Sequence, residues 1–248
     1  MKVEAIRTRV FRQGDDLLGF ITEHVRRLEE NSVLAVTSKI VSLSEGRVRE
    51  VIDEHTREQV IREESQWAIK TKYTWLTVKD GIVMASAGVD ESNADGKIIL
   101  LPRDCFESAE KIRTALRKEY GVKNLGVLIT DSRIYPLRAG LAAVAMGYAG
   151  FKGIRDYRGK SDIFGRKFSF TRTDVADSLA TAAVLEMGEG AEQQPLAVIT
   201  GAPVEFADAV SRDELKIDVR DDMYQPVFEH IREIKWPNDP PAVLKGKE

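Results

Sequence analysis

The sequence predicts a mixed α/β fold (α+β), in which sheets of strands pack against helices. Three kinds of segment indicate it. Short apolar runs rich in β-branched residues are typical of buried strands, and Leu125–Thr130 is the clearest of them. Segments with apolar residues every three or four positions, such as Ser108–Tyr120, are typical of helices that bury one face. Asp80-Gly81, between two alternating segments, predicts a β-hairpin.

The composition is that of a globular protein with ample material for a core. The chain has 248 residues, enough for one large domain or two small ones. Its net charge of −3 argues against a general binder of nucleic acid or of membrane surfaces. No apolar run approaches the roughly 18 residues that span a bilayer. The N-terminal segment has no apolar signal-peptide core, and the single cysteine, Cys105, fits a reducing compartment. We therefore expect a cytoplasmic protein.

The N-terminal third alternates between short strands and charged helical segments. Gly14-Asp15-Asp16 precedes a helix over Leu17–Leu28, whose positive end the two carboxylates would face. Arg49–Lys72 is highly charged with scattered apolar positions, which predicts a mostly helical, solvated arm. The strands expected up to the first acidic loop and just after it are Val3–Phe11, Val33–Thr37, Tyr73–Lys79, Ile82–Ala87 and Ile98–Leu101.

The C-terminal half continues with elements that must pack closely. Gly140–Gly150 is almost wholly small and apolar, which predicts a buried element with close backbone approach. Thr173 or Asp174 would cap an alanine-rich helix over Val175–Met187. We expect one unit over residues 1–248, or two subdomains formed by residues 1–85 with 191–248 and by residues 86–190. The other elements expected are strands Phe168–Arg172 and Leu196–Thr200, helices Ser211–Asp218 and Tyr224–Ile234, and a proline-rich tail from Trp236.

Acidic side chains follow strands and a helix at points that suit a cation. Asp131-Ser132 leaves the central strand, and Asp90 leaves the second strand of the hairpin in the same way. Carboxylate and hydroxyl oxygens are ligands that Mg²⁺ and Mn²⁺ prefer. Glu189 lies just beyond the C-terminus of the helix over Val175–Met187, where a bound cation would reverse an unfavourable interaction with the helix dipole. Asp90, Asp131 and Glu189 are therefore candidate metal ligands, although Asp131-Ser132 taken alone favours a turn in which Asp131 caps backbone amides.

Two segments carry positive charge where an anion could bind. Ser38-Lys39 directly follows the strand Val33–Thr37, so a hydroxyl and an ammonium could hold a phosphate there. Phe151–Lys167 is basic and is interrupted by glycines, which suits a polyanionic ligand. An ordinary strand-to-loop step and a solvated surface loop explain these two segments equally well. The sequence has neither G-x-x-x-x-G-K-[ST] nor G-x-G-x-x-G, so a nucleotide would bind without a Walker A or Rossmann loop.

Five motifs together resemble those of one family, the coenzyme F420-0:L-glutamate ligases (gamma-glutamyl ligases). The resemblance runs from about Gly14 to about Gly201. It implies the mixed α/β fold of that family, an intertwined homodimer, and an amide ligase that adds L-glutamate to a carboxylate of a coenzyme precursor. It also implies GTP or ATP as cosubstrate and two Mg²⁺ or Mn²⁺ ions. The motifs are SLSEGRV (Ser42–Val48), SAGVDESN (Ser86–Asn93), VLITDS (Val127–Ser132), GKSDIFGR (Gly159–Arg166) and VADSLATAAVLEMGEG (Val175–Gly190).

The resemblance implies roles for individual residues. Asp90 and Asp131 would share one metal, while Ser132, where the family usually has threonine, and Glu189 would hold the second. We assign three arginines to the carboxylates of the acceptor or of the incoming glutamate, because guanidinium groups pair well with carboxylates. These arginines are Arg138, Arg158 and Arg166. The positions that match nucleotide contacts are Ser38, Lys39, Asn93, Gly188 and Gly190.

The sequence also departs from the family pattern. Tyr135 stands where T-D-T-x-G-R places an arginine, and Leu43 stands where lysine is usual. Thr8-Arg9-Val10-Phe11 aligns with a nucleotide loop that often contains proline. The pattern Asp-Ser-Arg…Pro-Leu-Arg is closer to a bacterial branch suspected of glutamylating folate. The expected acceptor is therefore folate or F420-0, and the alternatives are a non-catalytic nucleotide- or coenzyme-binding homologue and a metal-dependent phosphohydrolase.

Overall fold

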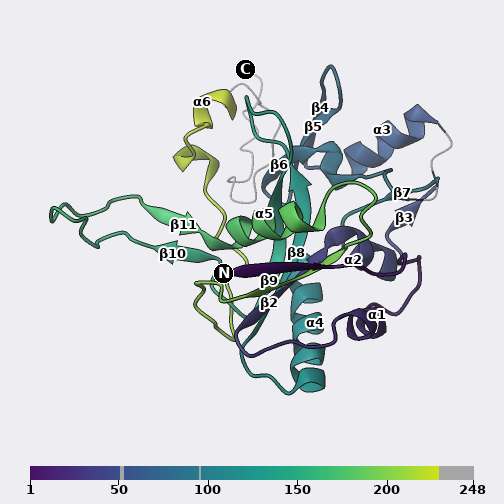
Figure 1. The fold of residues 1–248 in the computed structure, drawn as a ribbon. Coiled ribbons are helices and arrows are strands. Elements are labelled where there is room, and N and C mark those ends of the chain that lie inside the picture. Colours follow the sequence, from purple (N-terminus) through teal and green to yellow (C-terminus); the bar gives the residue numbers. More distant parts are fainter. Residues whose placement is uncertain (51–52, 95, 229–248) are drawn as a thin grey trace, which may run out of the picture. The chain divides into compact units, whose positions relative to one another are not determined.

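The computed structural model describes residues 1–50, 53–94 and 96–228, drawn as a ribbon in Figure 1. It has the predicted mixed α/β fold, with several sheets and packed helices. The chain separates into a larger unit, residues 1–50 and 90–215, and a smaller unit made of the described parts of 51–89 and 216–248. This division does not coincide with the predicted subdomains. The reason is that strands β2 and β8, placed in different subdomains by that prediction, pair in one sheet.

The larger unit is built on a five-stranded sheet. Its strands lie in the order β1 (Lys2–Ile6), β12 (Leu196–Thr200), β2 (Ser32–Thr37), β8 (Leu125–Arg133) and β9 (Ala142–Ala149). Only β2 and β8 are parallel neighbours in this sheet; the other pairs are antiparallel. Because β2 and β8 run in the same direction, their carboxyl ends meet at the same edge of the sheet.

Helix α5 (Val175–Met187) packs on one face of this sheet and also covers the free edge of β9. Its core partners include Val33, Leu128 and Ile199, all fully buried. The Thr181 hydroxyl bonds to the Ala143 backbone, donating to the carbonyl at 3.1 Å, and the Ala145 N–H donates to Asp177 at 2.9 Å. These hydrogen bonds use backbone N–H and C=O groups of β9 that could otherwise pair with a further strand.

Alternate residues of the same strands face the other side of the sheet. Leu34, Val36 and Ile129 are buried there, and α4 (Cys105–Tyr120) packs against β8 and β9 (Figure 1). Helices α1 (Leu17–His24) and α2 (Ser38–Ser44) contact each other, and α2 contacts β2 and β8. The short strands β3 (Val48–Arg49) and β7 (Ile98–Ile99) pair antiparallel. In the described ranges no helix has both the length and the apolarity needed to cross a membrane.

Two aspartates cap helices of the larger unit in the same way, but their surroundings shift their pKa values in opposite directions. Asp174 accepts a hydrogen bond from the Asp177 N–H at 2.9 Å at the start of α5, and Asp104 accepts one from the Glu107 N–H at 2.8 Å at the start of α4. Burial, followed by repulsion from the Asp177 carboxylate, raises the pKa of Asp174 to about 6. Burial alone would raise the pKa of Asp104, but the Glu107 N–H and the Arg212 guanidinium lower it.

We expect Asp174→Asn to stabilise the protein above pH 6, by about 1 kcal/mol, because asparagine keeps the cap without the charge. The folded-state pKa of Asp174 lies above its ordinary value of 3.8. The stability that its proton supplies is therefore present below pH 4 and is lost as the pH rises through 6. The gain of the variant should disappear below pH 4. Asp104→Asn, the matched control, should destabilise at neutral pH. Urea unfolding at several pH values measures both, and an equal loss in the two variants at pH 8 would contradict the prediction.

The smaller unit contains the predicted hairpin. Strands β5 (Trp75–Lys79) and β6 (Ile82–Ala85) pair antiparallel, and Asp80 and Gly81 both have positive φ, as a type I′ turn requires. The helical arm expected over Arg49–Lys72 is wrong in its second half. Only α3 (Glu54–Glu63) is helical, because Trp67–Lys70 forms strand β4 against β5. Residues 51–52 lie outside the described residues.

Several predicted boundaries also differ. β1 ends at Ile6, and α1 ends at His24 because Val25 has extended backbone angles. Most of Phe168–Arg172 is loop, and the strand β11 (Arg172–Asp174) pairs instead with β10 (Ile154–Asp156). Residues 211–218 form turns, not a helix, followed by the 3-10 helix η2 (Val219–Asp221). Helix α6 covers Gln225–Phe228, and the rest of the expected last helix and the tail lie outside the described residues. For β11 the reason is its pairing with β10, which the local spacing of apolar residues does not record.

Candidate functional site at the ends of strands β2 and β8

The parallel pairing of β2 and β8 joins two predicted site residues. Thr37 lies opposite Thr130, so the residues that follow them are neighbours. The Ser38 hydroxyl donates to Asp131 Oδ1 at 3.1 Å. Asp131 and Ser132 belong to β8 and pair with Val144 and Ala143, which excludes the turn interpretation of this pair.

The Asp131 carboxyl is electrostatically strained. Burial raises its pKa to about 7. Hydrogen bonds from the Ser38 hydroxyl and the Ser132 N–H lower the pKa, whereas the nearby Asp90 carboxylate raises it further. Asp90 and Asp131 are therefore close enough for their charges to repel each other. A positive charge between them would stabilise both ionised carboxylates.

Asp90 is held by the loop that follows it and by one lysine. Its backbone exchanges hydrogen bonds with Ile99, at 3.0 and 2.8 Å. Its carboxylate accepts from the Ser92 N–H at 2.7 Å and from the Ser92 hydroxyl at 3.1 Å. The Lys39 Nζ lies 2.7 Å from Asp90 Oδ2. Burial alone would raise the pKa of Asp90, but Lys39 and the Ser92 donors lower it.

The second pair of candidate ligands forms on the opposite side of β8. Successive side chains of a strand point to opposite faces, so Asp131 meets Ser38 while the Ser132 hydroxyl donates to Glu189, at 2.9 and 2.8 Å from its two oxygens. Gly188 ends α5 with a positive φ of 82° and donates its N–H to the Val184 carbonyl at 2.9 Å. The Asn93 side chain donates to the Gly190 carbonyl at 3.3 Å, which joins this loop to the one after Asp90.

The chemistry of these donors fits hard divalent cations. In the described part of the chain, no three His, Cys, Asp or Glu side chains gather as a metal-binding group. The four candidate ligands instead lie in two pairs, Asp90 with Asp131 and Ser132 with Glu189. All four offer oxygen ligands, and a cation beside the buried Asp131 would favour its ionised form. Asp90 and Asp131 would hold one ion, and Ser132 with Glu189 a second.

The three arginines predicted to bind carboxylates lie elsewhere. Arg138 is exposed in the loop between β8 and β9, and its N–H donates to the Tyr135 carbonyl at 3.3 Å. Arg158 and Arg166 lie on the β10–β11 hairpin, which leads away from the five-stranded sheet (Figure 1). The Arg158 guanidinium pairs with Asp156 at 2.6 Å on the same hairpin and lowers the pKa of that carboxyl to about 2. Between the described residues of one chain, none of the three guanidinium groups hydrogen-bonds to the candidate metal ligands.

Comparison with known proteins decides the family. Residues 5–201 match the model of the F420-0:gamma-glutamyl ligase family. The chain belongs to this family. It is 37% identical over 217 residues to the coenzyme F420:L-glutamate ligase of Methanopyrus kandleri, covering 80% of this chain and 85% of that protein. The enzymes of the same name from Archaeoglobus fulgidus and Haloarcula marismortui are 33% identical (79% of this chain, 85% of theirs) and 30% identical (90% and 95%). The predicted family and the predicted enzyme class, a ligase, are confirmed.

Sequence reasoning missed two polar residues at the site of this ligase. Ser92 contributes a backbone N–H and a hydroxyl to Asp90, and the spacing Asp-x-Ser is a known signal for such a turn. Arg133 follows Ser132 and places its guanidinium over the Tyr135 ring, 5.1 Å from the ring centroid, with one nitrogen 3.9 Å from Asp177. Its buried Nε has no hydrogen-bond partner among the described residues. Tyr135, the departure from the family motif, thus stacks under the arginine two positions before it.

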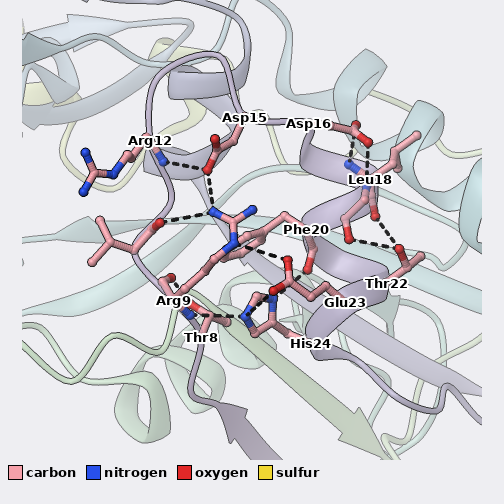
Figure 2. Close-up of polar contacts among 12 residues, drawn as sticks. Thr8, Arg9, Arg12, Asp15, Asp16, Leu18, Phe20, Thr22, Glu23 and His24 are labelled. Carbon is pink, nitrogen blue, oxygen red and sulfur yellow. Dashed lines mark hydrogen bonds and ion pairs between the residues drawn. The ribbon is translucent and has the colours of Figure 1, made fainter.

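The N-terminal loop of the ligase, Thr8–Phe11, is held on α1 by polar contacts (Figure 2). The Arg9 guanidinium pairs with Asp15 at 2.6 Å and Glu23 at 3.2 Å. The Arg9 N–H donates to His24 Nε2 at 3.2 Å, while His24 Nδ1 lies 2.8 Å from the Phe20 carbonyl. These two contacts fix the His24 ring between the loop and α1. Arg9 therefore serves to anchor the loop, and Asp15 pairs with it instead of facing the helix dipole.

Proposed function

We propose that this ligase adds L-glutamate to a carboxylate of a coenzyme precursor through an acyl phosphate formed from GTP or ATP. The observation that carries the proposal is the meeting of Ser38, Lys39, Asp90 and Asp131 at the carboxyl ends of two parallel strands. Acidic oxygens and a lysine at one place suit a metal-bound nucleotide phosphate. The relatives are named coenzyme F420:L-glutamate ligases, so F420-0 is the first candidate acceptor.

The reaction proceeds in two transfers. An acceptor carboxylate oxygen attacks the γ-phosphorus, and the bond to the β-phosphate oxygen breaks, which leaves an acyl phosphate and a nucleoside diphosphate. The glutamate amine then attacks the acyl carbon, phosphate leaves with the carbon–oxygen bonding pair, and the nitrogen loses a proton. Mg²⁺ or Mn²⁺ on Asp90, Asp131, Ser132 and Glu189 would neutralise the phosphate oxygens.

The residues of the chain position the reactants. Lys39 would pair with a phosphate oxygen. Arg138, Arg158 and Arg166 would bind the carboxylates of the acceptor or of glutamate. The other contacts to the nucleotide would come from Ser38, Asn93, Gly188 and Gly190.

The ligase would work as a homodimer. The loop of the β10–β11 hairpin exposes Ile163, Phe164 and Phe170, each about nine-tenths accessible in the single chain. Large apolar side chains gathered on one projecting hairpin are typical of an interface. A second copy covering this hairpin would also enclose Arg158 and Arg166, which lie on it.

Folate is the second candidate acceptor. The motif around Asp131 has Tyr135 in place of the usual arginine, and Arg133, whose buried Nε has no hydrogen-bond partner within the described ranges, stands beside that position. A different arrangement of arginine and aromatic ring next to the metal ligands is a reason to expect a different acceptor.

Mass spectrometry of the reaction of the purified full-length protein tests the proposal. The reaction contains Mg²⁺, Mn²⁺, ATP, GTP and L-glutamate, with F420-0 in one arm and tetrahydrofolate in the other. We expect one acceptor to gain a glutamyl residue, together with phosphate release that depends on glutamate. Phosphate release without glutamate would favour a phosphohydrolase. Bound nucleotide without release would favour a non-catalytic homologue.

A further inference from the structure

We propose that the Lys39 ammonium occupies the place of a cation at the Asp90 carboxylate and must leave before a divalent ion binds there. The inference rests on the proposed function, in which Asp90 is a metal ligand. It makes Lys39 a residue with two successive partners, first a carboxylate and then a nucleotide phosphate.

Lys39 is held as a bound cation would be. Its Nζ lies 2.7 Å from Asp90 Oδ2, 2.7 Å from the Ser92 carbonyl oxygen and 2.9 Å from the Ser92 hydroxyl. An ammonium group has three donors, so these three oxygens use all of them. The Lys39 side chain is only 23% exposed. A positive charge surrounded by carboxylate, carbonyl and hydroxyl oxygens has the ligand set of a hard cation.

While Lys39 is present, three of the roughly four acceptor positions of the Asp90 carboxylate are in use. Oδ1 accepts from the Ser92 N–H at 2.7 Å, and Oδ2 accepts from the Ser92 hydroxyl at 3.1 Å and from Lys39. A divalent ion on the same carboxylate would lie close to the ammonium, and two positive charges at that separation repel each other. The Ser92 N–H is part of the turn and its hydroxyl is neutral. Lys39 is the charged group, and it has a long flexible side chain, so it is the group that moves.

The release of Lys39 would couple the metal to the nucleotide. Lys39 is the second residue of α2, next to Ser38, which bonds to Asp131. Once a metal neutralises Asp90, the ammonium is free to pair with a phosphate at this edge of the sheet. Metal loading would therefore prepare the site for the nucleotide, and the metal-free protein would keep its acidic loop in place through Lys39.

Manganese binding to the metal-free, full-length protein tests the inference without nucleotide, acceptor or turnover. Free Mn²⁺ is followed by its electron paramagnetic resonance signal in the wild type, Lys39→Met, Asp90→Asn and Lys97→Met. Lys97 is the matched control, because its ammonium donates to the Gln13 side chain at 3.2 Å and to none of the candidate metal ligands among the described residues. We expect Lys39→Met to bind one Mn²⁺ at least tenfold more tightly than the wild type. Lys97→Met should match the wild type, and Asp90→Asn should bind that ion more weakly.

Two results would overturn the inference, and they differ in what they mean for the proposed function. Equal affinity in the wild type and Lys39→Met, with weaker binding in Asp90→Asn, overturns the role of Lys39 and leaves the metal site standing. If Asp90→Asn binds Mn²⁺ as tightly as the wild type, Asp90 is not a metal ligand. That result overturns both the role of Lys39 and the metal site in the proposed function.

A measurement on the wild type keeps the inference testable if Lys39→Met does not fold. Acylation of lysines by an amine-reactive ester, read by peptide mass spectrometry, reports how accessible each ammonium is. We expect Mn²⁺ to increase the acylation of Lys39 several-fold while that of Lys97 stays constant. Unchanged acylation of Lys39 at saturating Mn²⁺ contradicts its displacement.

Discussion

Asp131→Asn is expected to lower glutamyl transfer by roughly 10²–10³-fold or more while the protein stays folded. The substitution removes one negative charge from the place where Asp90 and Asp131 would hold a metal ion. Asparagine has nearly the same shape and still accepts the hydrogen bond from Ser38. The loss should therefore fall on metal-dependent turnover and not on the fold.

The same variant should not lose stability without metal. Burial raises the pKa of Asp131 to about 7, with a further contribution from the Asp90 charge, so the ionised carboxylate opposes folding at pH 8. We expect the thermal midpoint of metal-free Asp131→Asn at pH 8 to equal or exceed that of the wild type. Circular dichroism melts measure it, and product formation is followed by mass spectrometry. Asp16→Asn, which changes the cap of α1, is the control and should keep turnover. Full turnover by Asp131→Asn would remove Asp131 from the site.

Gly147→Ala is expected to destabilise the larger unit by about 2–4 kcal/mol, because the added methyl group would overlap backbone atoms. Gly147 lies in β9 against the first turn of α4. A Cβ at this position would lie 2.4 Å from the Cys105 carbonyl carbon and 2.6 Å from the Phe106 nitrogen. Both are backbone atoms, so no change of side-chain rotamer relieves the overlap. Strand and helix would have to separate, and the buried contacts around them would loosen.

Urea unfolding of wild type, Gly147→Ala and Gly190→Ala separates close packing from the general effect of replacing a glycine. At Gly190 the nearest atom to an added Cβ is a carboxylate oxygen of Glu192 at 3.3 Å, on a flexible exposed side chain. We expect Gly190→Ala to change the free energy of unfolding by less than about 1 kcal/mol. Similar losses in the two variants would show that the approach of β9 to α4 is not the cause.

Local signals in the sequence were enough for several elements and for the identity of the acidic candidates. Helix α5 and strand β12 have the predicted bounds, Val175–Met187 and Leu196–Thr200. The capping residue Asp174 and the apolar run before Thr200 act within a few residues, so neighbours in the sequence decide these elements. Asp131 and Glu189 were identified in the same way, from the ends of elements that local patterns define.

Partners far away in the sequence were decided only by the tertiary structure. Ser38 and Asp131 are 93 residues apart, and Ser132 and Glu189 are 57 apart. Both pairs depend on the parallel register of β2 with β8 and on the packing of α5. The strand at Trp67–Lys70 forms because β5 offers it an edge, although the charged segment Arg49–Lys72 that contains it predicted a helix. Residue types and their spacing define which side chains are available for a site. Strand pairing over long sequence separations decides which of these side chains meet, because local interactions do not determine that pairing.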